Sequence, residues 1–265
     1  MQPMWHASLV VLSLALPALG LAAPAVRPIQ LKGSFGAMTV RVPTGGGAHP
    51  LVLLQHGWLV HAKQYDFLAE HLVARGFAVA SLEQPDNTDL RPSVWIGHAQ
   101  KALDHLEAEN AAPGARLRGK LDLARVAAVG HSLGGATVLG LAATDARIKV
   151  AVAAAPATHA RFRAELLGYA ERISVPVLML GGGVDFIAPP SLFARPVAAR
   201  CRSCRVEEQP LANHLNFSSP GLTLSVPTPF GMLPLTMDGD RQRAWLAQRT
   251  TAWLDQALGS PGASR

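Results

Sequence analysis

The sequence predicts an α/β fold in which a mostly parallel central sheet carries helices on both faces. The 265 residues are 49% hydrophobic and 16% charged, a balance typical of a chain that buries a sizeable core. From residue 51 onward, short apolar runs alternate with longer amphipathic ones, which is the pattern of strands joined by crossover helices. Several apolar runs are continuous, as expected of strands covered on both faces.

Each predicted element follows from this alternation. Strands are expected at 38–42, 51–55, 77–82, 125–129, 150–154, 177–180 and 205–209. Helices are expected at 62–75, 93–109, 134–143, 160–170, 190–200 and 241–258. The last helix gathers large apolar side chains on one side, so that side is expected to pack on the core; they are Trp245, Leu246, Trp253 and Leu254.

Residues 1–23 are predicted to be a secretory signal peptide. An apolar run at 7–16 is followed by Pro17 and by small residues that end at Ala22 and Ala23. Residues 24–265 are then expected to form a single domain of a periplasmic or secreted protein with no stable membrane anchor. Because no Lys or Arg precedes the apolar run, an uncleaved anchor is kept as the alternative.

The net charge is +6, but the distribution of the basic residues predicts no nucleic-acid partner. Its densest basic run, at 195–205, lacks the interleaved aromatic residues that are typical of a nucleic-acid surface. We therefore interpret the basic residues as a solvated face.

The strongest local signal is Gly-His-Ser-Leu-Gly-Gly at 130–135. It follows a predicted strand and opens a predicted helix, which is the setting of a nucleophile on a strained turn. Such a turn brings helix and strand close together and leaves no room for a Cβ atom at Gly130 or Gly134. Ser132 is therefore the predicted nucleophile, and a serine that only caps the helix is the alternative.

A serine hydroxyl needs a base within hydrogen-bond reach and a carboxylate that orients the base. In sites of this kind the acid and then the base follow the serine, on loops after later strands. Asp185 follows the strand at 177–180 and is the predicted acid, with a helix cap as its alternative role and Glu207 as the alternative acid. His214 is the only histidine after Asp185, so it is the predicted base.

Backbone N–H groups are expected to form an oxyanion hole beside this serine. One donor is Leu133, the residue after the nucleophile, and the other is Trp58, which follows Gly57 at the end of an early strand. The indole of Trp58 is also predicted to form a wall of the substrate pocket, with simple packing as the alternative.

These residues resemble the α/β-hydrolase superfamily over nearly the whole mature chain, through His-Gly-Trp at 56–58, the motif at 130–135, Asp185 and His214. The segment 84–88 and the compact length are similar to the branch that holds chlorophyllases, platelet-activating-factor acetylhydrolases and polyester hydrolases. The resemblance implies an α/β-hydrolase fold and no cofactor, and the histidines show no metal-ligand spacing, so no metal is expected.

The resulting prediction is an exported, monomeric serine hydrolase that cleaves small or polymeric carboxylic esters through an acyl-enzyme. An acyltransferase or peptidase on the same triad is one alternative. A non-catalytic binding protein that keeps the fold is another.

Two further segments carry predictions. Cys201 and Cys204 are expected to form one small disulfide, worth roughly 2 kcal/mol by loop entropy, with free thiols as the alternative.

The long segment 216–238 is apolar and has no charged residue before Asp238. It is predicted either to pack on the domain as structural padding or to line a substrate groove, with Phe217 as a substrate-binding residue.

Overall fold

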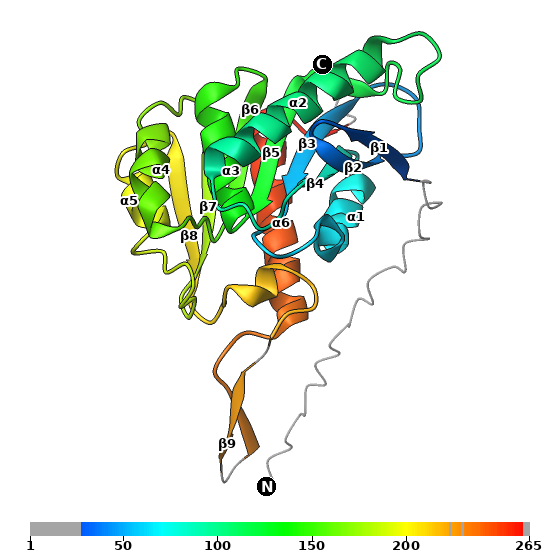
Figure 1. The fold of residues 1–265 in the computed structure, drawn as a ribbon. Coiled ribbons are helices and arrows are strands. Elements are labelled where there is room, and N and C mark those ends of the chain that lie inside the picture. Colours follow the sequence, from blue (N-terminus) through cyan, green and yellow to red (C-terminus); the bar gives the residue numbers. More distant parts are fainter. Residues whose placement is uncertain (1–27, 223, 229–230, 262–265) are drawn as a thin grey trace, which may run out of the picture.

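The computed structural model describes residues 28–222, 224–228 and 231–261 (Figure 1). Its main sheet has eight strands in the order β1-β2-β4-β3-β5-β6-β7-β8. Strands β3 to β8 run parallel to one another, and β2 pairs antiparallel with both β1 and β4. The strands are β1 (Ile29–Gly33), β2 (Gly36–Arg41), β3 (His49–Gln55), β4 (Ala78–Glu83), β5 (Leu121–His131), β6 (Ile148–Ala154), β7 (Val177–Gly182) and β8 (Cys204–Gln209). The predicted α/β-hydrolase fold is confirmed.

Helices cover both faces of this sheet (Figure 1). One apolar cluster joins the sheet to α2 (Pro92–Ala111), α3 (Leu133–Thr144), α4 (Arg163–Ala170) and α5 (Ala194–Ala198). A second cluster, on the other face, joins it to α1 (Asp66–Ala74) and α6 (Gly239–Leu258). Short 3-10 turns complete the set: η1 (Ala62–Tyr65), η2 (Ala160–Phe162) and η3 (Leu215–Phe217). The alternation of buried side chains along each strand supplies both clusters.

The structure differs from the predicted elements mainly at the edges. Strand β1 was not expected, because its sequence is short and half polar, as an edge strand tolerates. The predicted helix at 190–200 shortens to α5, because residues 190–193 form a turn before Ala194. The segment 216–238 contains a separate two-stranded sheet of β9 (Ser225–Thr228) and β10 (Gly231–Pro234).

The predicted signal peptide at 1–23 lies outside the described residues, so export stays a prediction. Within the described part of the chain, no helix is long and apolar enough to cross a membrane.

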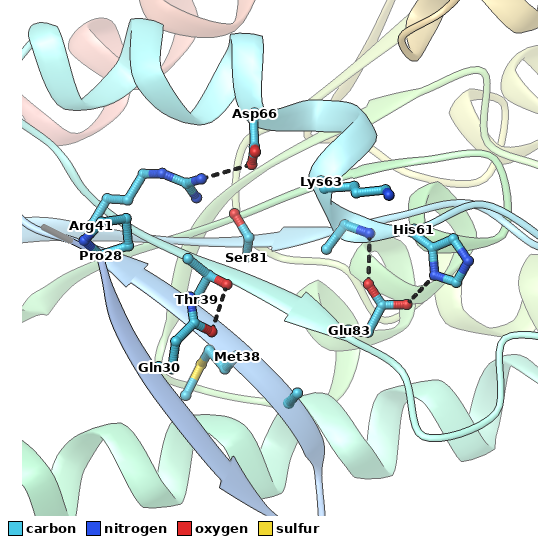
Figure 2. A pocket seen from close by; sticks show the side chains of 12 residues that line it. Pro28, Gln30, Met38, Thr39, Arg41, His61, Lys63, Asp66, Ser81 and Glu83 are labelled. Carbon is cyan, nitrogen blue, oxygen red and sulfur yellow. Dashed lines mark hydrogen bonds and ion pairs between the residues drawn. The ribbon is translucent and has the colours of Figure 1, made fainter.

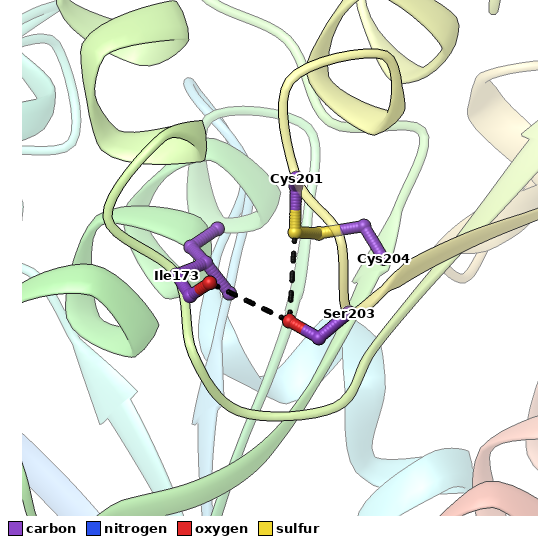
Figure 3. Close-up of a disulfide and its surroundings, with 4 residues drawn as sticks. All are labelled: Ile173, Cys201, Ser203 and Cys204. Carbon is purple, nitrogen blue, oxygen red and sulfur yellow. Dashed lines mark hydrogen bonds between the residues drawn. A yellow bond between two sulfur atoms is a disulfide. The ribbon is translucent and has the colours of Figure 1, made fainter.

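The predicted disulfide is confirmed (Figure 3). Cys201 and Cys204 are bonded at the junction between α5 and β8, with their Cα atoms 5.3 Å apart. Ser203, between them, donates a hydrogen bond from its hydroxyl to the backbone oxygen of Ile173 at 3.5 Å. The bond therefore closes a tight loop that is also fixed to the segment before β7.

Candidate active site

Ser132 stands on a sharp turn between β5 and α3, with φ 56° and ψ −122°. A positive φ is strained for a serine, and the surrounding backbone enforces it. A Cβ atom at Gly130 would collide with the backbone of Gly134, and one at Gly134 would collide with the backbone of His56. Only glycine fits at both positions, as the sequence predicted.

The structure brings Ser132, His214 and Asp185 into one hydrogen-bonded chain. The Nδ1 atom of His214 lies 2.8 Å from Oδ2 of Asp185, and Nε2 lies 3.0 Å from Oγ of Ser132. A carboxylate only accepts, so Nδ1 carries the proton and Nε2 is free to accept the serine hydroxyl. This arrangement prepares Ser132 to lose its proton to His214.

The carboxylate of Asp185 is buried and fully held. Its Oδ1 atom accepts hydrogen bonds from the backbone N–H groups of Ile187 at 2.9 Å and Ala188 at 2.7 Å, which leaves Oδ2 for His214. The alternative acid, Glu207, accepts hydrogen bonds from Nε and Nη2 of Arg249 at 2.6 and 2.7 Å. That pairing lowers the pKa of Glu207, and the described structure gives this carboxylate no hydrogen bond to His214.

The loop that carries His214 is fixed by α6. Gln242, which is completely buried, accepts from the backbone N–H of Asn213 at 3.0 Å and donates to its backbone oxygen at 2.7 Å. Gln242 was not among the predicted site residues, because it stands between Arg241 and Arg243 in the first turns of α6 and belongs to no sequence motif.

The predicted oxyanion donors lie beside the serine. A Cβ atom at Gly57 would come within 3.1 Å of the Ser132 Cβ, so the loop after β3 touches the turn of the nucleophile. Among the described residues, no group accepts a hydrogen bond from the backbone N–H of Trp58 or Leu133. The Trp58 indole donates to the backbone oxygen of Thr88 at 3.0 Å, which holds the half-exposed ring against the loop after β4.

His56 fixes the peptide that carries the Trp58 N–H. Its Nε2 atom accepts from the backbone N–H of Gln84 at 3.0 Å, so Nδ1 carries the proton and donates to the oxygen of Gly57 at 2.7 Å. The C=O of Gly57 and the N–H of Trp58 belong to one planar peptide and point in opposite directions. Holding the oxygen therefore sets the direction of the N–H. Burial lowers the pKa of His56 and favours this neutral form.

His131 and Tyr65 form a buried layer behind His214. Gly57 donates its N–H to the Tyr65 oxygen at 3.3 Å, and that oxygen lies 2.7 Å from Nδ1 of His131. Burial raises the pKa of Tyr65 and holds the pKa of His131 well below its usual value. The His131 ring packs on that of His214, with centroids 4.6 Å apart. The base therefore lies against a neutral ring and not against a second cation.

The structure corrects the prediction for Phe217. Its side chain is 0% exposed and packs between His131 and Trp245, with ring centroids 5.5 and 6.3 Å away. A residue with no exposed surface cannot touch a substrate. Phe217 supports His131 from behind and belongs to the core shared with α6.

A cavity of about 440 Å³ lies elsewhere, beside β2, β4 and η1, and includes none of Ser132, Asp185 and His214 (Figure 2). Two ion pairs lie in its lining, Arg41 with Asp66 and His61 with Glu83, each at 2.8 Å. The lining is Pro28, Gln30, Ala37, Met38, Thr39, Arg41, His61, Ala62, Lys63, Asp66, Ser81 and Glu83. We assign this cavity no ligand.

Comparison with known proteins decides the family. A family model described as PET hydrolase-like matches residues 18–214, which include Ser132, Asp185 and His214. The chain belongs to the PET hydrolase-like family.

Curated relatives of this PET hydrolase-like chain include cutinases and a terephthalate ester hydrolase. Cutinase 2 of Thermobifida cellulosilytica is 28% identical over 61% of this chain and 58% of its own length. Cutinase est1 of Thermobifida alba is 27% identical over 61% of this chain and 51% of its own. A bis(hydroxyethyl) terephthalate hydrolase of Streptomyces coelicolor is 26% identical over 61% of this chain and 49% of its own. The chain thus spans about half the length of these relatives.

Proposed function

We propose that this chain is a serine hydrolase that cleaves carboxylic esters, polymeric esters included, through an acyl-enzyme intermediate. The observation that carries the proposal is the hydrogen-bonded chain from Ser132 through His214 to Asp185. The family and the names of the relatives support ester substrates.

The mechanism follows from the positions of the groups. Ser132 Oγ attacks the ester carbonyl while its proton moves to Nε2 of His214, and the carboxylate of Asp185 stabilises the imidazolium. The N–H groups of Trp58 and Leu133 donate to the developing oxyanion. The imidazolium then returns the proton to the leaving alcohol. Water repeats the sequence on the acyl-enzyme and releases the acid.

The test uses p-nitrophenyl esters of increasing acyl length and bis(hydroxyethyl) terephthalate. The purified protein is expected to hydrolyse them and to be labelled by a fluorophosphonate probe. Ser132→Ala is expected to abolish labelling and to reduce turnover by about 10⁶-fold, as when a catalytic unit is broken. A wild-type protein that neither labels nor turns over any ester would favour the non-catalytic binding protein. Faster transfer to an added alcohol or amine than to water would favour an acyltransferase.

A further inference from the structure

Exposed apolar side chains gather in one part of this molecule. Every large hydrophobic residue that the structure describes as exposed lies in a segment that follows β3, β7 or β8; they are Trp58, Leu59, Phe186, Ile187, Leu192, Leu211, Leu215, Leu222, Leu224, Met232 and Leu235. These parallel strands end at the same edge of the sheet from which Ser132 emerges. Scattered exposed hydrophobics are normal, but their confinement to one edge indicates an interaction surface.

The most prominent part of this surface is the hairpin of β9 and β10 together with Leu222, Leu224, Leu235 and Thr236, and we call these residues the arm. In Figure 1 the strands of the arm extend away from the main sheet and its helices. None of the described residues of the arm pairs with a strand of the main sheet. A lone two-stranded hairpin is only marginally stable in water. The exposed apolar side chains of the arm do not pack in the core. Met232 is 62% exposed.

The root of the arm is built into the loop of the catalytic base. Asn213 donates from its side chain to the backbone oxygen of Leu222 at 3.0 Å. Asn216, completely buried, accepts from the N–H of Leu222 at 2.6 Å and donates to the oxygen of Met237 at 2.9 Å. Two asparagines that flank His214 thus hold both ends of the arm. Whatever binds the arm is brought to the edge that carries Ser132.

The chemistry of the surface selects its partner. From Gln209 to Met237 the chain has no Lys, Arg, Asp or Glu. Segments that bind anionic lipid surfaces carry Lys or Arg beside their apolar side chains, and this one does not. A proline in each strand, Pro227 and Pro234, removes a backbone donor and disfavours pairing with a strand of a second copy. An uncharged, water-insoluble surface matches these properties.

We propose that the arm, together with Phe186 and Ile187, docks the chain onto the surface of a neutral, water-insoluble ester polymer. Phe186 is 87% exposed and follows Asp185 directly, so it adds an exposed apolar side chain beside the predicted catalytic acid. The proposal rests on the proposed function for the ester chemistry. The docking itself requires no turnover.

The test measures adsorption of the inactive Ser132→Ala protein to poly(ε-caprolactone) nanoparticles by cosedimentation. In this background, Leu224→Ser, Met232→Ser and Leu235→Ser together are expected to weaken adsorption at least tenfold. The matched control, Leu224→Met, Met232→Leu and Leu235→Met, keeps the apolar area and is expected to adsorb like the parent. Phe186→Ser, at a position too exposed to affect folding, is expected to weaken adsorption as a single change.

Several results would overturn the docking surface. One is unchanged adsorption of the serine variants, and another is an equal loss in the matched control. Stronger binding to phosphatidylglycerol vesicles than to the nanoparticles would assign the arm to membranes. A dimer in light scattering that the serine variants dissociate would assign it to a second copy. Hydrolysis of soluble p-nitrophenyl acetate by the Ser132 protein is measured separately, so failure of the esterase function is distinguished from failure of docking.

Discussion

The turn at Ser132 and the segment after His214 differ in how closely the sequence specifies the structure. At 130–135 the glycines leave one backbone conformation, because any side chain at Gly130 or Gly134 would collide with neighbouring backbone. The segment 216–238 has many apolar residues and no charged residue before Asp238, yet Phe217 is completely buried and Met232 is mostly exposed. A steric clash with neighbouring backbone identifies the single residue type that fits at a given position. Apolar composition does not, because it is the same for a segment that packs in the core and for one that forms a docking surface.

The largest expected effect comes from a substitution in the hydrogen-bonded chain that begins at the turn of Ser132. Asp185→Asn is expected to reduce kcat by about 10⁴-fold, because the amide favours the wrong tautomer of His214. Glu207→Gln is the control and is expected to retain turnover, since Glu207 is paired with Arg249. Steady-state hydrolysis of p-nitrophenyl butyrate measures both. A small loss in Asp185→Asn together with a large one in Glu207→Gln would reverse the assignment of the acid.

Two substitutions in the segment 216–238 test which of its apolar side chains belong to the core. Phe217→Ala is expected to lower the free energy of unfolding by about 3–5 kcal/mol, because it opens a cavity behind His131. Met232→Ser, on the arm, is expected to change it by less than about 0.5 kcal/mol. Urea denaturation measures both. Equal stability losses would mean that the arm belongs to the core.

The two buried histidines next to the site, His56 and His131, predict a dependence of stability on pH. The folded-state pKa of both His56 and His131 is lowered by burial, so the unfolded chain binds protons that the folded chain does not. Stability is therefore expected to be full above about pH 6.5 and to fall below it, by up to about 1.4 kcal/mol per pH unit for each histidine. Urea denaturation between pH 8 and 5 checks this, and a flat profile would contradict it. His56→Asn, with one such group fewer, is expected to give a shallower slope.

The smallest effect concerns the orientation of a single peptide. His56→Ala is expected to lower kcat about 10- to 100-fold with little change in KM, because the Gly57–Trp58 peptide loses the hydrogen bond that directs its N–H. His56→Asn places an amide N–H near the position of Nδ1 and is expected to recover most of kcat. If alanine and asparagine reduce kcat equally, the hydrogen bond to Gly57 does not direct the donor.

Local sequence patterns were enough to predict the alternation of strands and helices along the chain, the tight turn at Ser132, and the chain order of Ser132, Asp185 and His214 as site residues. Each follows from local rules: the period of apolar residues, the steric demands of a tight turn, and the chain order of loops at one edge of a parallel sheet. The disulfide was also within reach, since only two cysteines exist and they lie three residues apart.

The distant side chains that support the site could be found only from the packing of the folded chain. Gln242 contacts the loop of His214 from a helix that begins after the arm, and Tyr65 reaches His131 across 66 positions of sequence. No local pattern encodes such a pairing, because a buried polar side chain finds its partner through the packing of separate elements. The same packing buried Phe217 and left Met232 in solvent, since burial depends on which surface an apolar side chain meets and not on its own hydrophobicity.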